Sequence, residues 1–489
     1  MLFNSPEFAL AFLPLSIVLY FWLTSCRCLA AGKAWLVLAS LFFYGWWNPH
    51  YLPLIMISLL VNYSLGRWLA IAASMPRPIK NGLLGCGVVF NLGLLTYYKY
   101  AGFLLGNLAL LLGRSVHEIS PTLPLAISFF TFTQIAYLVD SYRGQTREYS
   151  LLNYALFVTF FPHLIAGPIV HHKHIVPQFS NLRCSLLRYR NIALGLTLFA
   201  IGLAKKVLFA DTLAQWAVFG FDKSETLTMI EAWATSLSYT FQLYFDFSGY
   251  TDMALGAALM FNIRLPVNFN SPYRAPSIRD FWRRWHITLS RFLRDYLYIP
   301  LGGNRHSATR THINLLVTFV LGGLWHGATW MFVIWGALHG LAMIIHRAWR
   351  SLGGRMPGWL GWLITFNFIN ATWVFFRAPN IEAAHKVLKA MVAVDSLAIS
   401  SERGSLLMVI DKLQQSVAHP LIDATLWPVI FVFAFVIVLW PQNSTSRWLA
   451  GGAWETIGYG RAAAYGLLTA IGVIIMLASP YSEFIYFNF

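Results

Sequence analysis

The sequence predicts an all-α polytopic membrane protein, and two observations support that fold class. Of the 489 residues, 57% are hydrophobic and only 11% are charged, whereas soluble domains carry about 25% charged residues. The hydrophobic residues form continuous runs, as lipid-buried helices require, rather than the alternating pattern of an outer-membrane barrel. This composition excludes a soluble enzyme, a disordered chain and a secreted disulfide scaffold.

The first three apolar runs predict a topology. Residues 8–23 have no Lys or Arg before them, and Arg27 and Lys33 follow. A secretory signal carries its positive charge in front of the apolar run. We therefore expect a retained helix with an extracytoplasmic N-terminus and a cytoplasmic C-terminal end. Residues 34–47 and 52–73 then form a hairpin that returns the basic flanks to the same side.

More apolar runs follow along the rest of the chain. Several are shorter than the about 20 residues that cross a bilayer, which is typical of re-entrant or tilted helices buried in protein. We expect about eleven crossings together with short re-entrant or interfacial helices. The runs are residues 83–98, 103–112, 123–139, 151–169, 192–203, 230–245, 253–261, 313–323, 330–345, 360–375, 427–440 and 462–477.

Two segments interrupt the apolar pattern. Residues 264–310 contain nine Arg against Asp280 and Asp295. Residues 379–420 begin with apolar positions at helical spacing behind Asn380, which favours a helix N-cap, and we expect a peripheral amphipathic helix there. Basic cytoplasmic loops account for the net charge of +16 without nucleic-acid binding, and part of this charge could attract a polyanionic substrate.

Two histidines lie in contexts that favour function. His326 lies within or beside apolar sequence, where an ionisable group is costly and often functional. Imidazole is the usual group for proton transfer near neutral pH, although a hydrogen-bonded His inside a bundle is the structural alternative. His286 lies among alternating aromatic residues and arginines, of which Arg283 and Arg284 could bind an anionic group. The alternative there is an interfacial helix with cytoplasmic arginines.

Charged residues at apolar depth need partners. We expect Asp246 and Asp252 to pair structurally with the arginines of the following segment rather than to act in acid–base chemistry. We expect Lys205 and Lys206, which interrupt another apolar run, to snorkel to an interface. The histidine cluster at 171–174 contains no Cys or carboxylate, so no metal site is expected.

Characteristic sequence stretches connect these residues. They are YFDFSGYTDMA at 244–254, NFNSPY at 268–273, FWRRWH at 281–286, LRDYLYIPLGGNR at 293–305, GGLWHG at 322–327, PHLIAGPI at 162–169 and EFIYFNF at 483–489. Together they resemble the membrane-bound O-acyltransferase (MBOAT) family, with a closer likeness to its bacterial alginate O-acetyltransferase branch. The likeness spans nearly the whole chain, and GGLWHG is its most specific part.

The resemblance implies helices around a thin central region, with a channel that joins the two membrane faces. It implies one domain over residues 1–489 with a catalytic core at 230–350. His326 would be the central catalytic residue and His286 the second core histidine. Cytoplasmic acetyl-CoA would be the donor, and no permanently bound cofactor is expected. The acetyl group would pass to a separate extracytoplasmic partner protein and then to an exported polysaccharide.

We predict that residues around these histidines bind the donor, whose phosphates suit arginine, and that buried polar residues support them. The predicted donor-binding residues are Arg283, Arg284, Arg294, Trp285, Trp325 and Asn304. The predicted supporting residues are Asp246, Asp252, Tyr250 and Asp295.

The predicted function is O-acetylation of an exported polysaccharide, such as alginate or cellulose, by a multi-pass protein of the bacterial inner membrane. His326 would act as general base on an acceptor hydroxyl or would first take the acetyl group itself. Peptidoglycan O-acetylation and teichoic-acid D-alanylation would use the same core. A transporter or structural subunit of a polysaccharide export complex is an alternative of another class, for which inverted repeats would be expected.

Overall fold

The structure is a computed structural model that describes residues 1–71, 76–113, 121–146, 150–393, 427–441, 443–445, 459–478 and 483–488. Within these ranges all regular structure is helical, as the apolar runs predict. The chain divides into two compact units, Met1–Phe199 with Met253–Val267 and Ala200–Asp252 with Asn268–Phe489. The expectation of one membrane domain over the whole chain stays a prediction.

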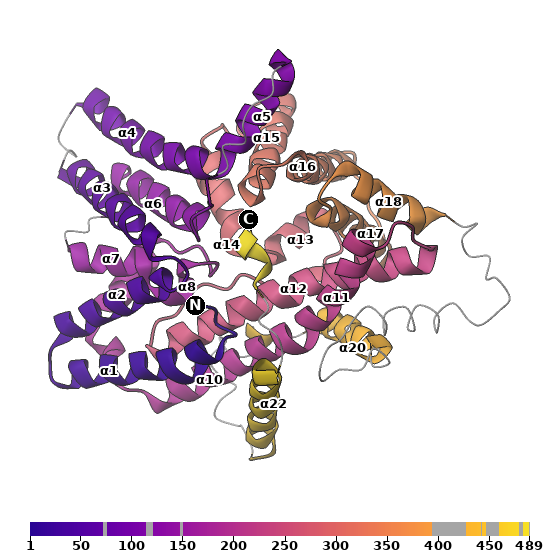
Figure 1. The fold of residues 1–489 in the computed structure, drawn as a ribbon. Helices are drawn as coiled ribbons and strands as arrows, with labels where there is room; N and C mark the ends of the chain where they lie inside the picture. The colour runs from indigo at the N-terminus through magenta and orange to yellow at the C-terminus, as the bar shows by residue number, and fades with distance from the viewer. Residues whose placement is uncertain are drawn as a thin grey trace. The chain divides into compact units, whose positions relative to one another are not determined.

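The first unit is built from helices (Figure 1). Its helices are α1 (Leu13–Ser25), α2 (Leu29–Gly45), α3 (Leu52–Ile71), α4 (Arg77–Leu95), α5 (Ala101–Leu112), α6 (Ile127–Tyr142), α7 (Leu151–Thr159), α8 (Phe161–Leu164), α9 (His172–Ser180), most of α10 (Tyr189–Ala204), the π-helical turns Glu7–Phe12 and Thr96–Tyr100, and the 3-10 turns Pro49–Tyr51 and Leu182–Cys184. Asn48 accepts a hydrogen bond from the His50 amide at 3.0 Å and forms the predicted turn between α2 and α3.

Aromatic packing and close helix approaches hold this unit together. Phe8 is fully buried, and its ring centroid lies 4.7 Å from that of Phe3 and 5.6 Å from that of Phe43. A Cβ on Gly66 would overlap the Tyr137 ring, so glycine is what allows α3 to approach α6 there.

The second unit contains the remaining helices. They are α11 (Asp211–Val218), most of α12 (Met229–Met260), α13 (Ile278–Arg284), α14 (Ile287–Leu293), α15 (Ala308–His326), α16 (Trp330–Ser351), α17 (Gly358–Arg377), α18 (Ile381–Val392), α20 (Trp427–Leu439), α22 (Tyr459–Ala478), the π-helical turns Lys205–Ala210, Phe219–Lys223 and Arg294–Tyr298, and the 3-10 turns Pro272–Arg274 and Ile485–Asn488. Ser277 and Ser307 cap α13 and α15 by accepting hydrogen bonds from the amides three residues on, each at 3.3 Å.

One sequence expectation changes in this unit, and another is confirmed. The apolar runs 230–245 and 253–261 belong to one 32-residue helix, α12, which continues through the polar residues between them. Asn380 caps α18 as predicted, through a 2.9 Å bond from the Ala383 amide. Residues 394–420 of the predicted amphipathic segment lie outside the described residues.

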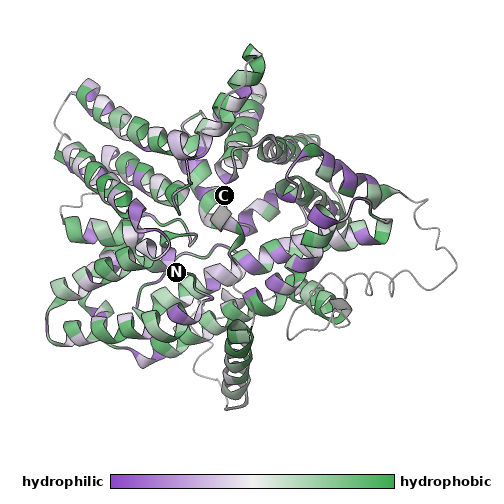
Figure 2. Ribbon diagram, in the orientation of Figure 1, coloured by the Kyte–Doolittle hydropathy of each residue, from purple (hydrophilic) through white to green (hydrophobic). Residues whose placement is uncertain are grey.

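Among the described residues, six helical segments are long and apolar enough to cross a membrane. In the hydropathy colouring of Figure 2, α20 and α22, which contain two shorter apolar segments, are green over most of their length. These features confirm the all-α membrane class, whereas the count of about eleven crossings stays a prediction. The six are Glu7–Ser25, Pro49–Ile71, Arg77–Leu112, Tyr189–Lys223, Trp330–Ser351 and Gly358–Arg377, and shorter apolar helices are Leu29–Gly45, Val429–Leu439 and Ala463–Ala478.

Candidate active site

Two closely packed helices position His326. α15 ends at this residue, and α16 begins four residues later and packs back along α15 (Figure 1). A Cβ on Gly323 would overlap the Phe332 carbonyl oxygen, and one on Gly336 would overlap the Phe319 carbonyl oxygen. Only glycine tolerates these backbone approaches, so the glycines of the GGLWHG stretch and of α16 fix the hairpin and the place of His326.

Aromatic rings surround the His326 imidazole. His326 is buried, with only 3% of its surface exposed. Its ring centroid lies 5.1 Å from that of Phe376, 5.2 Å from that of Trp335 and 5.6 Å from that of Tyr486. These rings limit the access of water to the imidazole, an environment in which polar interactions with a substrate are strengthened.

His286 lies at a strained turn between α13 and α14. Its φ of 41° is in the left-handed region, which non-glycine residues seldom adopt. The residue is fully buried. The side-chain hydroxyl of Thr288 and the Ile287 amide donate to Asn268 at 2.6 Å and 3.0 Å and hold the turn in place. Backbone strain of this kind persists where the surrounding structure fixes it, often at functional sites.

Trp325 connects the two histidines. Its ring centroid lies 4.9 Å from that of His326 and 6.0 Å from that of His286. Neither ring nitrogen of His286 makes a hydrogen bond within the described part of the chain. Burial lowers the pKa of His286 to about 3, so its imidazole is neutral near pH 7. The core therefore contains a neutral imidazole, that of His286, beside Trp325, whose indole ring also packs against His326.

A cavity of about 790 Å³ joins His326 to a group of arginines. Its volume lies within the usual range of about 300–1,000 Å³ for small-molecule sites. Its walls include apolar side chains of α14 and α15, and Gly322 and Trp335 line it together with His326. The arginines that line it are Arg279, Arg283, Arg291, Arg294, Arg347 and Arg350.

The predicted donor-binding residues divide into two groups. Arg283, Arg294 and Asn304 line the cavity with His326. Arg284, in contrast, donates to Asp280 at 2.7 Å, and Trp285 packs against Trp373 with ring centroids 5.1 Å apart. Neither Arg284, Trp285 nor Trp325 is among the cavity-lining residues. Asp295 accepts two hydrogen bonds from Arg294, at 2.6 Å and 3.0 Å.

Lysines, not arginines, neutralise the buried carboxylates. The Lys206 Nζ atom lies 2.8 Å from Asp246 Oδ1 and 2.9 Å from Asp211 Oδ1, and it donates to the Glu483 carbonyl oxygen at 3.0 Å. Lys205 Nζ lies 2.7 Å from Asp252 Oδ2. The expected arginine partners were therefore wrong, and so was the expected snorkelling of both lysines, whose side chains are 12% and 5% exposed.

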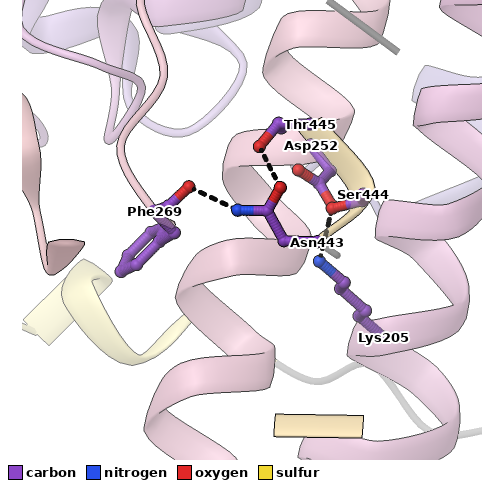
Figure 3. A network of polar contacts seen from close by, with 6 residues as sticks. All are labelled: Lys205, Asp252, Phe269, Asn443, Ser444 and Thr445. Atoms are coloured by element: carbon purple, nitrogen blue, oxygen red, sulfur yellow. Dashed lines mark hydrogen bonds and ion pairs between the residues drawn. The ribbon is translucent and has the colours of Figure 1, made fainter. Parts of the chain in front are cut away.

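The Lys205–Asp252 pair is part of a hydrogen-bond network that includes residues from a distant part of the chain (Figure 3). Ser444 donates to Asp252 Oδ2 at 2.6 Å and accepts from Lys205 at 2.9 Å. The neighbouring Asn443 donates to the Phe269 carbonyl oxygen at 2.9 Å. The network thus attaches residues 443–445 to the helices that carry the buried ion pairs.

The C-terminal segment reaches the same core. The Ile485 amide donates to Asp246 Oδ2 at 2.7 Å. The Phe484 ring stacks on Tyr250, with centroids 4.4 Å apart, and Tyr486 packs against Phe247 at 4.6 Å and against His326. Lys206 and Asp246 therefore anchor the segment that places Tyr486 beside the central histidine.

Comparison with known proteins decides the family. The family model of the membrane-bound O-acyltransferases matches residues 82–383. The chain belongs to the MBOAT family. It is 47% identical to the peptidoglycan O-acetyltransferase of Helicobacter pylori over 100% of this chain and 98% of that one. It is 42% identical to the "Probable alginate O-acetylase AlgI" of Pseudomonas aeruginosa, over 82% and 76%, and 28% identical to the teichoic acid D-alanyltransferase of Streptococcus thermophilus, over 52% and 68%.

Family membership confirms that this membrane protein is an acyltransferase, and the AlgI similarity confirms the predicted branch. The family match contains His286, His326 and the cavity arginines, whose individual roles stay predictions. No group of three His, Cys, Asp or Glu within the described ranges could hold a metal ion, and the absence of a metal cofactor likewise stays a prediction.

The sequence reasoning missed two residues of this MBOAT site. Tyr486 lies in the EFIYFNF stretch, but the sequence gives no sign of its contact with His326, because the two residues are 160 positions apart. His339 is one of 14 histidines, and its sequence context does not single it out. It is fully buried, its Nδ1 accepts from the Trp282 indole at 3.2 Å, and its Nε2 lies 3.2 Å from the Thr372 hydroxyl. Trp282 and Trp335, which both pack against His339, line the cavity.

Proposed function

We propose that the chain transfers acetyl groups from cytoplasmic acetyl-CoA to a polysaccharide of the cell envelope, with His326 as the catalytic residue. The observation that carries this proposal is the cavity, since it places arginines and His326 around one continuous space. Arginines bind phosphates through charge-assisted hydrogen bonds. The phosphates of coenzyme A would contact the arginines, and the thioester would extend along the apolar wall toward His326.

His326 would promote acyl transfer in one of two ways. As a general base it would take the proton of an acceptor hydroxyl while the new C–O bond forms and the C–S bond breaks, and the proton would then pass to the departing thiolate. As a nucleophile it would first form an acetyl-imidazole, releasing the thiolate, before the hydroxyl attacks. His286 and Trp325 would hold the imidazole in place.

Peptidoglycan is the first acceptor to test. The 47% identity to a peptidoglycan O-acetyltransferase extends over both chains almost completely, whereas the match to AlgI covers 82% of this chain. Alginate, cellulose or another exported polysaccharide is the second acceptor, which the AlgI similarity favours. In either case a separate extracytoplasmic protein would complete the transfer, within a polysaccharide assembly and export machinery at the bacterial inner membrane.

The test measures ester-linked acetate on purified peptidoglycan and on exported polysaccharide. A deletion strain would carry the wild-type gene, His326→Ala, or the control His385→Ala, which alters an exposed residue of α18. Equal membrane levels of each protein are checked by immunoblot. Loss of acetate from one polymer with His326→Ala alone, at unchanged polymer yield, supports the proposal and names the acceptor.

Two results would contradict the proposal. Unchanged acetate on both polymers in the His326→Ala strain would remove the catalytic role of His326. Loss of the polymer itself, with no turnover of acetyl-CoA by the purified wild-type protein, would favour an export subunit instead.

A further inference from the structure

A second hollow lies beside the donor cavity, on the surface of the hairpin formed by α16 and α17. It has a volume of about 760 Å³. Its long walls are apolar side chains of two helices that are long and apolar enough to span a membrane. We call this hollow the hairpin groove. Its α16 wall contains Leu338, Leu341, Ala342, Ile345 and Trp349, and its α17 wall contains Gly358, Gly361, Ile364, Thr365 and Phe368.

Helical spacing places the exposed apolar residues of the α16 wall on one face of that helix. Leu341, Ile345 and Trp349 are four residues apart and therefore share one face of α16. They are 47%, 67% and 46% exposed, and Ile364 on α17 is 52% exposed. On a membrane-spanning hairpin these side chains face lipid. Between Leu338 and Trp349 the helix rises roughly 17 Å, about half of the ~30 Å hydrocarbon core, which is the depth of one leaflet.

One end of the hairpin groove is basic. Arg279, Arg283 and Arg350 line it there, at the end of α16 that leads into the turn before α17. Asp280 also lines this end, and its carboxylate accepts a hydrogen bond from Arg284. Arg279 and Arg283 are exposed and form no ion pair with a described carboxylate. The positive-inside rule assigns this end to the cytoplasmic face, whose leaflet carries anionic lipids, and basic pockets between helices on that side suit their head groups.

We propose that the hairpin groove binds one anionic phospholipid. Its phosphate contacts Arg279, Arg283 and Arg350, and an acyl chain lies along Ile345 and Ile364 toward Leu338. Apolar walls of one-leaflet depth beneath these arginines fit this molecule. A soluble anion would leave the apolar walls without a contact, and a neutral lipid would leave the arginines without a negative charge to bind. The same three arginines line the donor cavity, so the lipid phosphate lies at the mouth of that cavity.

The chain offers a matched pair of variants on neighbouring positions of α17. Ile364→Trp fills the hairpin groove with a larger side chain. Leu363→Trp makes the same kind of change on a residue that is 43% exposed and does not line the groove. Gly358→Leu is a second filling variant, because a Cβ at Gly358 would meet no atom within 4 Å. Arg350→Gln tests the basic end.

The experiment uses native mass spectrometry of the purified full chain with equal phosphatidylglycerol and phosphatidylcholine. We expect one retained phosphatidylglycerol on the wild type and on Leu363→Trp. We expect at least a fivefold lower occupancy on Ile364→Trp and Gly358→Leu, and a reduced preference for phosphatidylglycerol on Arg350→Gln. Melting temperatures show whether each variant is folded, and Gly358→Leu decides the matter if Ile364→Trp is not.

Three results would overturn the proposal. The first is equal phosphatidylglycerol occupancy on Leu363→Trp and on a folded groove-filling variant. The second is equal retention of phosphatidylcholine by the wild type. The third is complete displacement of phosphatidylglycerol by inorganic phosphate, which would make the site one for a soluble anion. None of these readouts requires acetyl transfer, so the lipid proposal and the proposed function can fail separately.

Discussion

Replacing Lys206 by Met tests whether the buried ion pairs hold the C-terminal segment at the active site. The Lys206 and Asp246 side chains are 5% and 1% exposed. Removing one partner of a buried pair leaves an uncompensated charge and costs about 3–5 kcal/mol. The lost hydrogen bond to the Glu483 carbonyl oxygen adds about 1 kcal/mol. We expect Lys206→Met to destabilise the protein by about 4–6 kcal/mol in total.

The double variant Lys206→Met/Asp246→Asn separates charge from packing. In this variant the amide side chain introduced at position 246 carries no charge. Its oxygen can still accept the hydrogen bond that the Ile485 backbone amide donates to Asp246 in the wild type. The double variant should therefore lose less stability than the sum of the two single variants, with a coupling of at least about 1 kcal/mol. Thermal unfolding of the detergent-purified protein, followed by tryptophan fluorescence, measures each stability.

Lys205→Met is the matched control for activity. It also breaks a buried ion pair, but Lys205 contacts Asp252 and Ser444 rather than the C-terminal segment. Acetyl-CoA turnover per folded protein should fall further with Lys206→Met than with Lys205→Met, because only the former releases Tyr486 from His326. Wild-type stability of Lys206→Met, or equal loss of activity in the two variants, would refute this reasoning.

Three further predictions concern residues around the cavity. Tyr486→Phe should retain turnover if the ring only packs against His326, and Tyr486→Ala should lose at least tenfold, so a tenfold loss with Tyr486→Phe would instead assign a role to the hydroxyl. Arg283→Gln should raise KM for acetyl-CoA severalfold with little change in kcat, whereas Arg284→Gln, outside the cavity, should leave KM unchanged; steady-state kinetics compares them. Burial lowers the pKa of folded His286 below its unfolded value of about 6.5, so the unfolded state binds one more proton at acidic pH. Stability should therefore fall as pH decreases from about 6.5 toward 3, by about 1.4 kcal/mol for each pH unit. His286→Asn, which tolerates the left-handed backbone, should flatten that dependence, and an unchanged slope in melting temperature against pH would contradict the assignment.

Local sequence predicted the helices because an apolar run or a capping side chain acts over a few residues. Asn380 shows this, since its N-cap role depends only on the next turn. The limits of α12 were less predictable. Asp246 and Asp252 interrupt its apolar pattern, and only ion pairs with lysines about 40 positions or more upstream allow the helix to continue through them.

Tertiary contacts decided the parts of the site that the sequence could not predict. The family resemblance pointed to Arg283 and Arg294 near His326, and both line the cavity, whereas Arg347 and Arg350 of α16 were not expected there. Tyr486 reaches His326 through the anchoring of a terminal segment on Asp246, and no periodicity within that segment reveals it. His339 was hidden for a similar reason, because its partners Trp282 and Thr372 come from two other helices.

Lysine, rather than arginine, fits the space between the buried carboxylates Asp246 and Asp211. An ammonium group has three donors, and Lys206 finds two carboxylates and one carbonyl oxygen around it. The five-donor fork of an arginine would leave donors unsatisfied in that buried space. Because lysines neutralise the buried acids, Arg279 and Arg283 keep no carboxylate partner among the described residues. Their positive charge is therefore available to phosphates at the mouth of the cavity. Had these arginines paired with the buried carboxylates, as the sequence suggested, that charge would have been neutralised.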